Sequence, residues 1–323
     1  MDERRKDPST QGNAAPSLST DQLLARLEQH APRTSRYQSH GEIARGGMGA
    51  ILEVWDEDLR RSLAMKVILG RGETASGSKT PRDQKLLARF LEEAQITGQL
   101  DHPGIVPVHE LGLDSEGHVY FTMKLVKGRE LEEIFELAFE GQEDWNETRA
   151  LGVILKVCEA MAYAHQKNVI HRDLKPANVM VGNFGEVFVM DWGVARLLGE
   201  TDTHDLRLQT AGTTVALATE RTAHEGTADS PLYTMDGDIV GTPAYMPPEQ
   251  ARGDLQQLSA RSDVYSIGAM LYHLIARHMP YCPPGEKMTN HGVLTELLHG
   301  SPAPLETVRA DIPPALVAIC EKA

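Results

Sequence analysis

Residues 171–193 read HRDLKPANVMVGNFGEVFVMDWG and contain two short apolar runs separated by a glycine-bounded turn. This pattern predicts a β-hairpin. Asn178 precedes the first run and Asp191 follows the second, so antiparallel pairing brings them together at the open end of the hairpin. An amide oxygen and a carboxylate suit Mg²⁺, which binds a few protein groups together with phosphate oxygens. We therefore expect a magnesium site at this end of the hairpin.

Asp173 lies on the segment that leads into this hairpin, where its carboxylate can orient a hydroxyl beside the metal. Lys175 follows two residues later and can neutralise charge on a phosphate in transfer. Upstream, residues 151–165 carry apolar side chains at the spacing of an amphipathic helix, which leads directly into this segment. The combination indicates phosphate chemistry at a loop between a helix and a hairpin.

A glycine-rich turn occurs near the start of the chain. Residues 41–58, GEIARGGMGAILEVWDED, predict two strands joined by this turn. Gly46, Gly47 and Gly49 let the backbone come close to a ligand.

Lys66 lies in the predicted strand RSLAMKVI, on the face that it shares with Ala64 and Ile68. A lysine on a buried face needs a partner of opposite charge. Residues 88–100, ARFLEEAQITGQL, predict a helix with Glu93 on its inward stripe. We expect a Lys66–Glu93 ion pair, and a purely stabilising pair is the alternative to a catalytic one.

The segment HRDLKPAN at 171–178 resembles the catalytic loop of protein kinases, and DWG at 191–193 resembles their metal-binding DFG. The glycine turn, Lys66, Glu93, GTPAYMPPEQ at 241–250 and RSDVYSIG at 261–268 follow in the order of that family. The resemblance covers residues 37–323. The motif sequences are most similar to those of the bacterial eukaryotic-like serine/threonine protein kinases. It implies an α+β, bilobal protein-kinase fold with a small β-rich N-lobe and a larger, mostly helical C-lobe.

The resemblance also implies roles for single residues, with ATP and Mg²⁺ as cofactors. Asp173 would accept the proton of a protein Ser or Thr hydroxyl, assisted by Lys175. Asn178 and Asp191 would bind Mg²⁺, and Lys66, fixed by Glu93, would hold the α- and β-phosphates. The remaining nucleotide contacts implied are Ile43, Gly46, Gly47, Gly49, Ile51, Ala64, Met123 at the gatekeeper position and Val126 in the hinge at 124–126.

Three positions depart from the family pattern. Ala44 stands at the first glycine of the phosphate loop. Trp192 replaces the usual phenylalanine, and its indole N–H needs a partner if it is buried. The family arginine that pairs with the carboxylate at Glu249 does not follow, so we expect either a piece of a longer protein or another partner for Glu249.

The segment 194–240 is long for the family and rich in threonine. It is either a mobile insertion or an activation loop that is switched on by phosphorylation. By resemblance, Arg172 would pair with a loop phosphate, Thr234 would be an autophosphorylation site, and Thr242 together with Lys175 indicates Ser/Thr specificity. Self-association for autophosphorylation is a further expectation.

Composition limits the remaining possibilities. The 323 residues are 41% hydrophobic and 24% charged, typical of a soluble protein. The net charge of -14 argues against nucleic acid as a partner. The 3 cysteines lack metal-site or disulfide spacing, and no apolar run is long enough for a membrane span, so we expect a cytoplasmic protein.

The expected organisation is a disordered tail with a short helix at 1–36, a kinase N-lobe at 37–124 and a kinase C-lobe at 125–323 that is truncated at its C-terminal end. The expected function is transfer of the γ-phosphate of ATP to protein Ser and Thr hydroxyls. A nucleotide-binding pseudokinase scaffold and a small-molecule phosphotransferase are the alternatives. His171 is expected to support the loop through hydrogen bonds rather than to act as a base.

Overall fold

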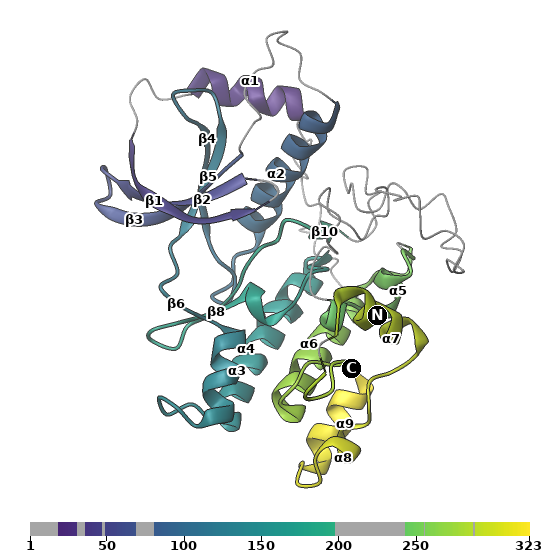
Figure 1. The fold of residues 1–323 in the computed structure, drawn as a ribbon. Helices are drawn as coiled ribbons and strands as arrows, with labels where there is room; N and C mark the ends of the chain where they lie inside the picture. The colour runs from purple at the N-terminus through teal and green to yellow at the C-terminus, as the bar shows by residue number, and fades with distance from the viewer. Residues whose placement is uncertain are drawn as a thin grey trace, which may run out of the picture.

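The computed structural model describes residues 19–30, 36–46, 49–68, 81–197, 243–254, 256–286 and 288–323. An antiparallel five-stranded sheet lies in the upper part of Figure 1, in the order β1-β2-β3-β5-β4. Its strands are β1 (Tyr37–Gly46), β2 (Gly49–Asp56), β3 (Arg61–Val67), β4 (Val108–Leu113) and β5 (Val119–Lys124). The strand-rich region predicted from the glycine turn and the strand after it is therefore confirmed.

The predicted alternation of side chains between the two faces of β3 is also confirmed. Ala64 and Ile68 join a cluster of buried side chains that includes Phe90 of helix α2 (Pro81–Gln99). Leu63 and Met65 point to the other face and join a second, smaller cluster. Because successive side chains of a strand point to opposite faces, this register directs Lys66 toward α2.

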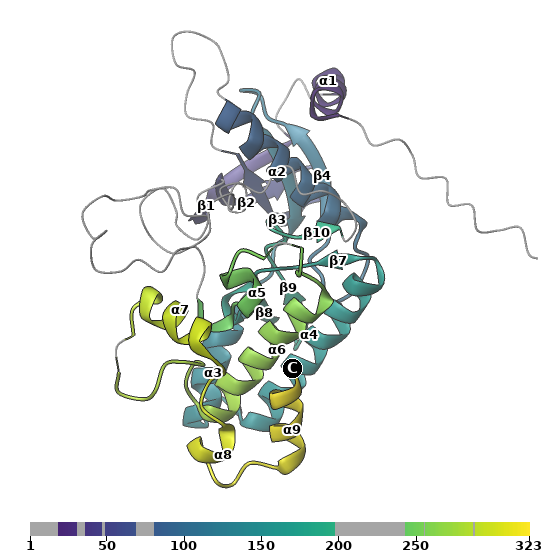
Figure 2. The ribbon, with the colours of Figure 1, turned by 90° about the vertical axis from the view of Figure 1, so that its right-hand side faces the viewer.

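Helices fill the lower part of the molecule (Figure 1). In chain order they are α3 (Leu131–Glu140), α4 (Glu147–Gln166), α5 (Pro248–Ala251), α6 (Ala260–Ala276), α7 (Asn290–His299), α8 (Leu305–Val308) and α9 (Pro314–Lys322). Helices α4 and α6 lie side by side and α9 lies below α6 (Figure 2). Their apolar faces form the largest buried cluster, which also takes in α3 and the hairpin strands. The expected α+β architecture, with a small sheet region and a larger helical region, is confirmed.

The predicted hairpin lies between the sheet and the helices. It consists of β8 (Val179–Gly182) and β9 (Val187–Val189), and β6 (Gly128–Glu130) extends it to three strands. Val179 pairs with Val189, so the open end of the hairpin is next to Asn178. Short elements flank it: β7 (Val169–Ile170) pairs with β10 (Arg196–Leu197), and the 3₁₀ turns are η1 (Pro176–Asn178) and η2 (Pro243–Tyr245).

A short helix, α1 (Thr20–His30), precedes the sheet and lies within the region 1–36 for which a short helix was predicted. Ser19 begins it, because the Ser19 hydroxyl accepts a hydrogen bond from the backbone N–H of Gln22. The helix lies beside β4 (Figures 1 and 2). Within the described ranges, no helix combines the length and the apolar character needed to cross a membrane.

Candidate active site

The open end of the hairpin brings together three of the residues predicted from the sequence. The backbone N–H of Met190 donates to the carbonyl of Asn178 at 2.8 Å, which places Asp191 beside Asn178. The amide nitrogen of Asn178 donates to the backbone carbonyl of Asp173 at 2.7 Å and to its Oδ2 at 3.2 Å. The hairpin and the preceding loop thus form one hydrogen-bonded unit.

Lys175 completes this unit on the side of Asp173. Its Nζ lies 3.1 Å from Asp173 Oδ2. Both side chains are about four-fifths buried. The described hydrogen bonds of the Asp173 carboxylate therefore use Oδ2, and Oδ1 remains as an acceptor.

Lys66 connects the sheet to the same place. Its Nζ lies 2.6 Å from Glu93 Oε1 on α2 and 3.7 Å from Asp191 Oδ1. Burial would lower the pKa of Lys66, but the carboxylates of Glu93 and Asp191 overcome this effect and raise the pKa. The lysine therefore stays charged, and the ion pair predicted from the sequence is present.

Asp191 occupies an unusual position. Its backbone has a φ of 56°, in the left-handed region that costs a non-glycine residue of order 1–3 kcal/mol. Burial would raise the pKa of its carboxyl group, but the charges of Lys66 and His171 lower it. Asp191 is thus an ionised carboxylate with 50% of its side chain exposed, facing a fixed cation.

Asp263 supports the loop from below, a role that the sequence did not reveal. It lies on α6 and is fully buried. Its carboxylate accepts hydrogen bonds from the backbone N–H groups of His171 and Arg172, both at 2.9 Å. His165 contacts the same carboxylate at 2.8 Å through Nε2. An acidic residue among the apolar side chains of 260–276 is the one signal in the sequence that would indicate a buried acceptor here.

His171 has the supporting role that was predicted. Its Nε2 lies 2.9 Å from the carbonyl of Met190, and its Nδ1 accepts from the backbone N–H of Asp173. The ring therefore bridges the loop and the end of the hairpin. Arg172, next along the chain, has a φ of 68° and donates from Nε to the carbonyl of Val194.

The remaining predicted nucleotide contacts lie along the sheet. Ala64 pairs with Met123 across β3 and β5, and Ile51 pairs with Lys66 across β2 and β3. Ala64 and Met123 belong to the cluster of buried side chains that includes residues of α2, and the partly buried Ile51 and Val126 pack against this cluster. The predicted nucleotide contacts at these four positions are therefore apolar side chains that pack on one cluster.

The glycine turn is described in part. Gly46 and Gly49 pair with each other at the ends of β1 and β2, while Gly47 lies outside the described residues. A methyl group at Gly49 would collide with the backbone carbonyl of Val67, whereas Gly46 has open space around it. Ile43 on β1 is 51% exposed. The glycine at 49 is therefore required by the close approach of β3.

Comparison with known proteins identifies this arrangement. The family described as "Protein kinase domain" matches residues 37–306. The chain belongs to the protein kinase family.

The curated proteins that match this kinase include bacterial relatives. It is 33% identical over 253 residues to "Serine/threonine-protein kinase PknD" of Protochlamydia amoebophila, which covers 76% of this chain and 23% of the relative. It is 34% identical over 296 residues to the protein of the same name from Chlamydia trachomatis serovar D, which covers 89% of this chain and 29% of the relative. The chain thus spans about a quarter of the length of these relatives, and the predicted resemblance to bacterial serine/threonine kinases is confirmed.

Two departures from the kinase pattern have local explanations. The indole N–H of Trp192 donates to the carbonyl of Val189 at 3.3 Å, and the ring lies 4.7 Å from that of His171. Glu249 accepts a hydrogen bond from the hydroxyl of Ser262 at 2.6 Å. The indole N–H of Trp192 and the carboxylate of Glu249 therefore each have a polar partner.

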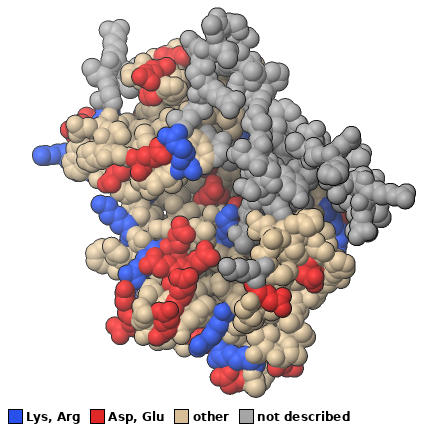
Figure 3. Space-filling model, viewed as in Figure 1, with Lys and Arg blue, Asp and Glu red and all other residues tan. Residues whose placement is uncertain are grey.

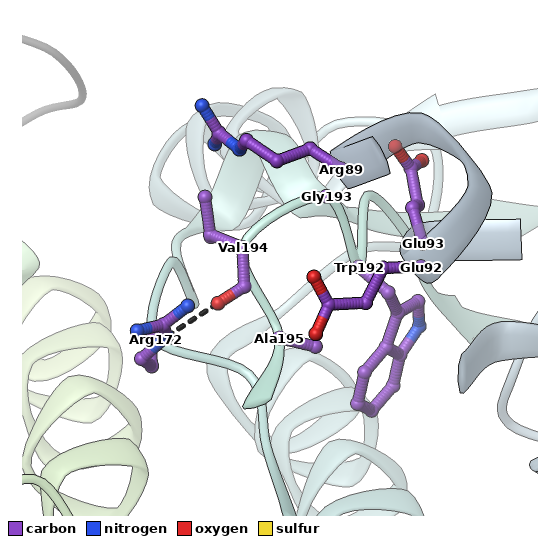
Figure 4. Close-up of a pocket in the computed structure, with 8 residues that line it drawn as sticks. All are labelled: Arg89, Glu92, Glu93, Arg172, Trp192, Gly193, Val194 and Ala195. Atoms are coloured by element: carbon purple, nitrogen blue, oxygen red, sulfur yellow. Dashed lines mark hydrogen bonds between the residues drawn. The ribbon is translucent and has the colours of Figure 1, made fainter. Parts of the chain in front are cut away.

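A small pocket lies between α2 and the segment after DWG (Figure 4). Arg89 of α2 and Arg172 both line it, together with Glu92, Glu93 and residues 192–195. In Figure 4, the side chains of Arg89 and Arg172 both extend toward the side of the pocket on which Val194 lies. Arg89 was not predicted, although it stands four residues before Glu93, one helical turn away.

Acidic side chains gather below the site. Figure 3 shows them over α3, whose exposed glutamates are Glu132, Glu133, Glu136 and Glu140. Partial burial of the carboxyl group, together with Glu130 and Glu136, raises the pKa of Glu132, while Lys175 opposes this shift. The acidic surface therefore extends to the neighbourhood of the loop that carries Lys175. Thr234 and Thr242 lie outside the described residues, as does the segment 198–242.

Proposed function

We propose that this chain is an ATP-dependent serine/threonine protein kinase that transfers the γ-phosphate of ATP to Ser and Thr hydroxyls of proteins. The observation that carries the proposal is one connected set of contacts. Glu93 holds Lys66, Lys66 faces Asp191, and Asn178 at the same hairpin end binds Asp173. The names of the matching relatives support the choice of Ser and Thr as acceptors.

Asp173 is proposed to orient the acceptor hydroxyl and take its proton. The hydroxyl oxygen forms a bond to the γ-phosphorus of ATP, and the bond from that phosphorus to the β–γ bridging oxygen breaks. The proton of the hydroxyl moves to Asp173 Oδ1, the carboxylate oxygen that remains as an acceptor. Lys175 neutralises charge that develops on the phosphoryl group.

Lys66 is proposed to hold the α- and β-phosphates. Its raised pKa keeps it cationic, and Glu93 fixes its position. Ile51, Ala64, Met123 and Val126 would enclose the adenine, with residues 124–126 as the hinge. Gly46, Gly47 and Gly49 would cover the phosphates, and Ile43 would be a further nucleotide contact. These residues belong to a proposed N-lobe at 37–124, followed by a proposed C-lobe at 125–323.

Asn178 and Asp191 fit the proposed magnesium site. The amide nitrogen of Asn178 is bonded to Asp173, which leaves the amide oxygen for a cation. Asp191 is half exposed, and its lowered pKa keeps it ionised. Oxygen donors of this kind are those that Mg²⁺ prefers, and the ion would neutralise charge on the phosphates.

Phosphorylation is proposed to activate the enzyme, with Thr234 as the site and Arg172 as the group that pairs with the phosphate. The pocket lined by Arg172 and Arg89 supports this role of Arg172, because the two guanidinium groups there can pair with the phosphate of a modified threonine. Self-association would let one copy modify another, and Thr242 would help to select Ser and Thr acceptors. The substrates are proposed to be cytoplasmic proteins.

A transfer assay tests the proposal. The purified chain is incubated with labelled ATP, Mg²⁺ and a basic protein, a suitable acceptor because of the acidic surface beside the catalytic loop. We expect label on Ser and Thr of the acceptor and none with Asp173→Ala. Nucleotide binding without transfer would instead identify a pseudokinase scaffold.

A further inference from the structure

Helix α1 lies outside the part of the chain that matches the kinase family, which begins at residue 37. It is nevertheless packed against the sheet region beside β4 (Figure 2). Leu23, Leu24 and Leu27 form one partly buried stripe of the helix, whereas Ala25 and Glu28 are exposed. The stripe packs against the buried cluster that includes residues of α2 and the sheet.

This cluster reaches both partners of the central ion pair. On one side it contains Leu87, Phe90 and Leu91 of α2, the helix that carries Glu93. Phe90 is fully buried and its ring lies 5.1 Å from that of Phe121. On the other side Phe121 pairs with Lys66 across β3 and β5. The leucines of α1 therefore pack against the same group of side chains that borders Lys66 and Glu93.

The Glu93 carboxylate depends on this packing for its orientation. Its Oε1 binds Lys66, while Oε2 is buried and has no hydrogen-bond partner among the described residues. A buried carboxylate with one unsatisfied oxygen is costly, so the polar contacts alone do not fix it. The position of α2 against the sheet must supply the constraint, and side chains in contact transmit small displacements because the interior is closely packed.

We propose that α1 is a positioning element of this kinase: its leucine stripe holds α2 against the sheet so that Glu93 keeps Lys66 aimed at the phosphates of ATP. The inference rests on the proposed function, because it assumes that Lys66 binds those phosphates. Leu23, Leu24 and Leu27 act through α2 and touch neither substrate. The chain thus carries a part of its own catalytic alignment outside the family domain.

The test compares the unchanged chain with Leu23→Ala/Leu24→Ala/Leu27→Ala. Alanine keeps the helical propensity and removes the apolar contacts. The matched control is Glu28→Ala/Gln29→Ala, which changes exposed residues of the same helix. Affinities for ATP with Mg²⁺ and for adenosine are measured, together with hydrogen exchange of the α2 amides.

For the leucine variant we expect affinity for ATP to fall about tenfold, the loss typical of one weakened charge-assisted contact. Affinity for adenosine, which has no phosphates, should stay unchanged. Hydrogen exchange of the backbone amides should become faster in α2 and stay unchanged in α6. The control variant should match the unchanged chain in each measurement.

Three outcomes would overturn the inference. These are an unchanged affinity for ATP, an equal loss of affinity for ATP and adenosine, and faster exchange confined to α1. If the triple variant does not fold, Leu27→Ala is measured in the same way. Failure of the proposed function is distinguishable, because the unchanged chain would then transfer no phosphate in the transfer assay, while hydrogen exchange in α2 would still report the contact with α1.

Discussion

At the scale of single residues, Asp173 is the group whose surroundings define the proposed chemistry. The change Asp173→Asn keeps the size of the side chain but removes the negative charge and one acceptor oxygen. We expect kcat to fall by about 10²–10³ or more, because a group that acts in the transition state is lost. Affinity for ATP should change little, since the contacts of Lys66 remain. Steady-state transfer and nucleotide titration measure both quantities.

Asp101→Asn is the matched control for Asp173→Asn, because Asp101 is exposed and lies outside the loop and the hairpin. It should transfer phosphate at the unchanged rate. Transfer at the unchanged rate by Asp173→Asn would contradict the proposed role of Asp173.

Gly49 and Gly46 give a second prediction at the residue scale. A methyl group at Gly49 would strike the carbonyl of Val67, so Gly49→Ala forces β2 and β3 apart. We expect the free energy of unfolding to fall by about 1–3 kcal/mol. Gly46→Ala, with open space at the same turn, should leave stability close to that of the unchanged chain. Denaturant titration of the two variants checks the contrast, and equal stabilities would contradict it.

At the scale of elements, α6 and the loop that carries Asp173 are joined through Asp263. The change Asp263→Asn replaces one acceptor oxygen by an amide nitrogen that faces backbone N–H donors. We expect a loss of about 2–3 kcal/mol in the free energy of unfolding, together with a fall in kcat. Thermal or chemical unfolding and the transfer assay measure the two effects. A variant with unchanged stability would show that the loop does not depend on this carboxylate.

The elements also show which parts of the fold and of the candidate site could be predicted from the sequence. The hairpin and helix α4 were predictable because each has a clear apolar period over its own residues. The contact of Lys66 with Glu93 followed from charge and spacing, and the proximity of Asn178 to Asp191 followed from antiparallel pairing. Asp263 was missed because its partners at 171 and 172 lie about 90 residues away, and no local pattern reports such a contact. The two-residue strands β7 and β10 are likewise too short to have a period.

At the scale of the whole molecule, the sheet region and the helical region meet at the candidate site. Ile105 pairs with Val189 of the hairpin in a single parallel bridge, and the N–H of Val189 donates to the carbonyl of Gly104. The ion pair from Lys66 to Asp191 crosses the same junction. The residues proposed for the chemistry therefore lie at the junction of two separately packed clusters.

The stability of the whole molecule should depend on pH through His273. This histidine is buried on α6 between Phe135 of α3 and Tyr245, whose hydroxyl lies 2.7 Å from Nδ1. Burial, with a smaller effect from His278, lowers the pKa of His273 from 6.5 to about 4. The unfolded chain therefore binds a proton at this residue between those two values while the folded chain does not, so stability falls as the pH falls through that window.

We expect His273 to account for about 1–2 kcal/mol of the loss in the free energy of unfolding between pH 7 and pH 5. His273→Gln keeps a neutral acceptor for Tyr245 and removes the titration, so its stability should fall less over the same interval. His299→Gln, an exposed histidine on α7, should keep the pH dependence of the unchanged chain. Denaturant titrations at the two pH values give the comparison. Equal pH dependence in the unchanged chain and His273→Gln would mean that the buried imidazole takes up its proton without opposing the fold.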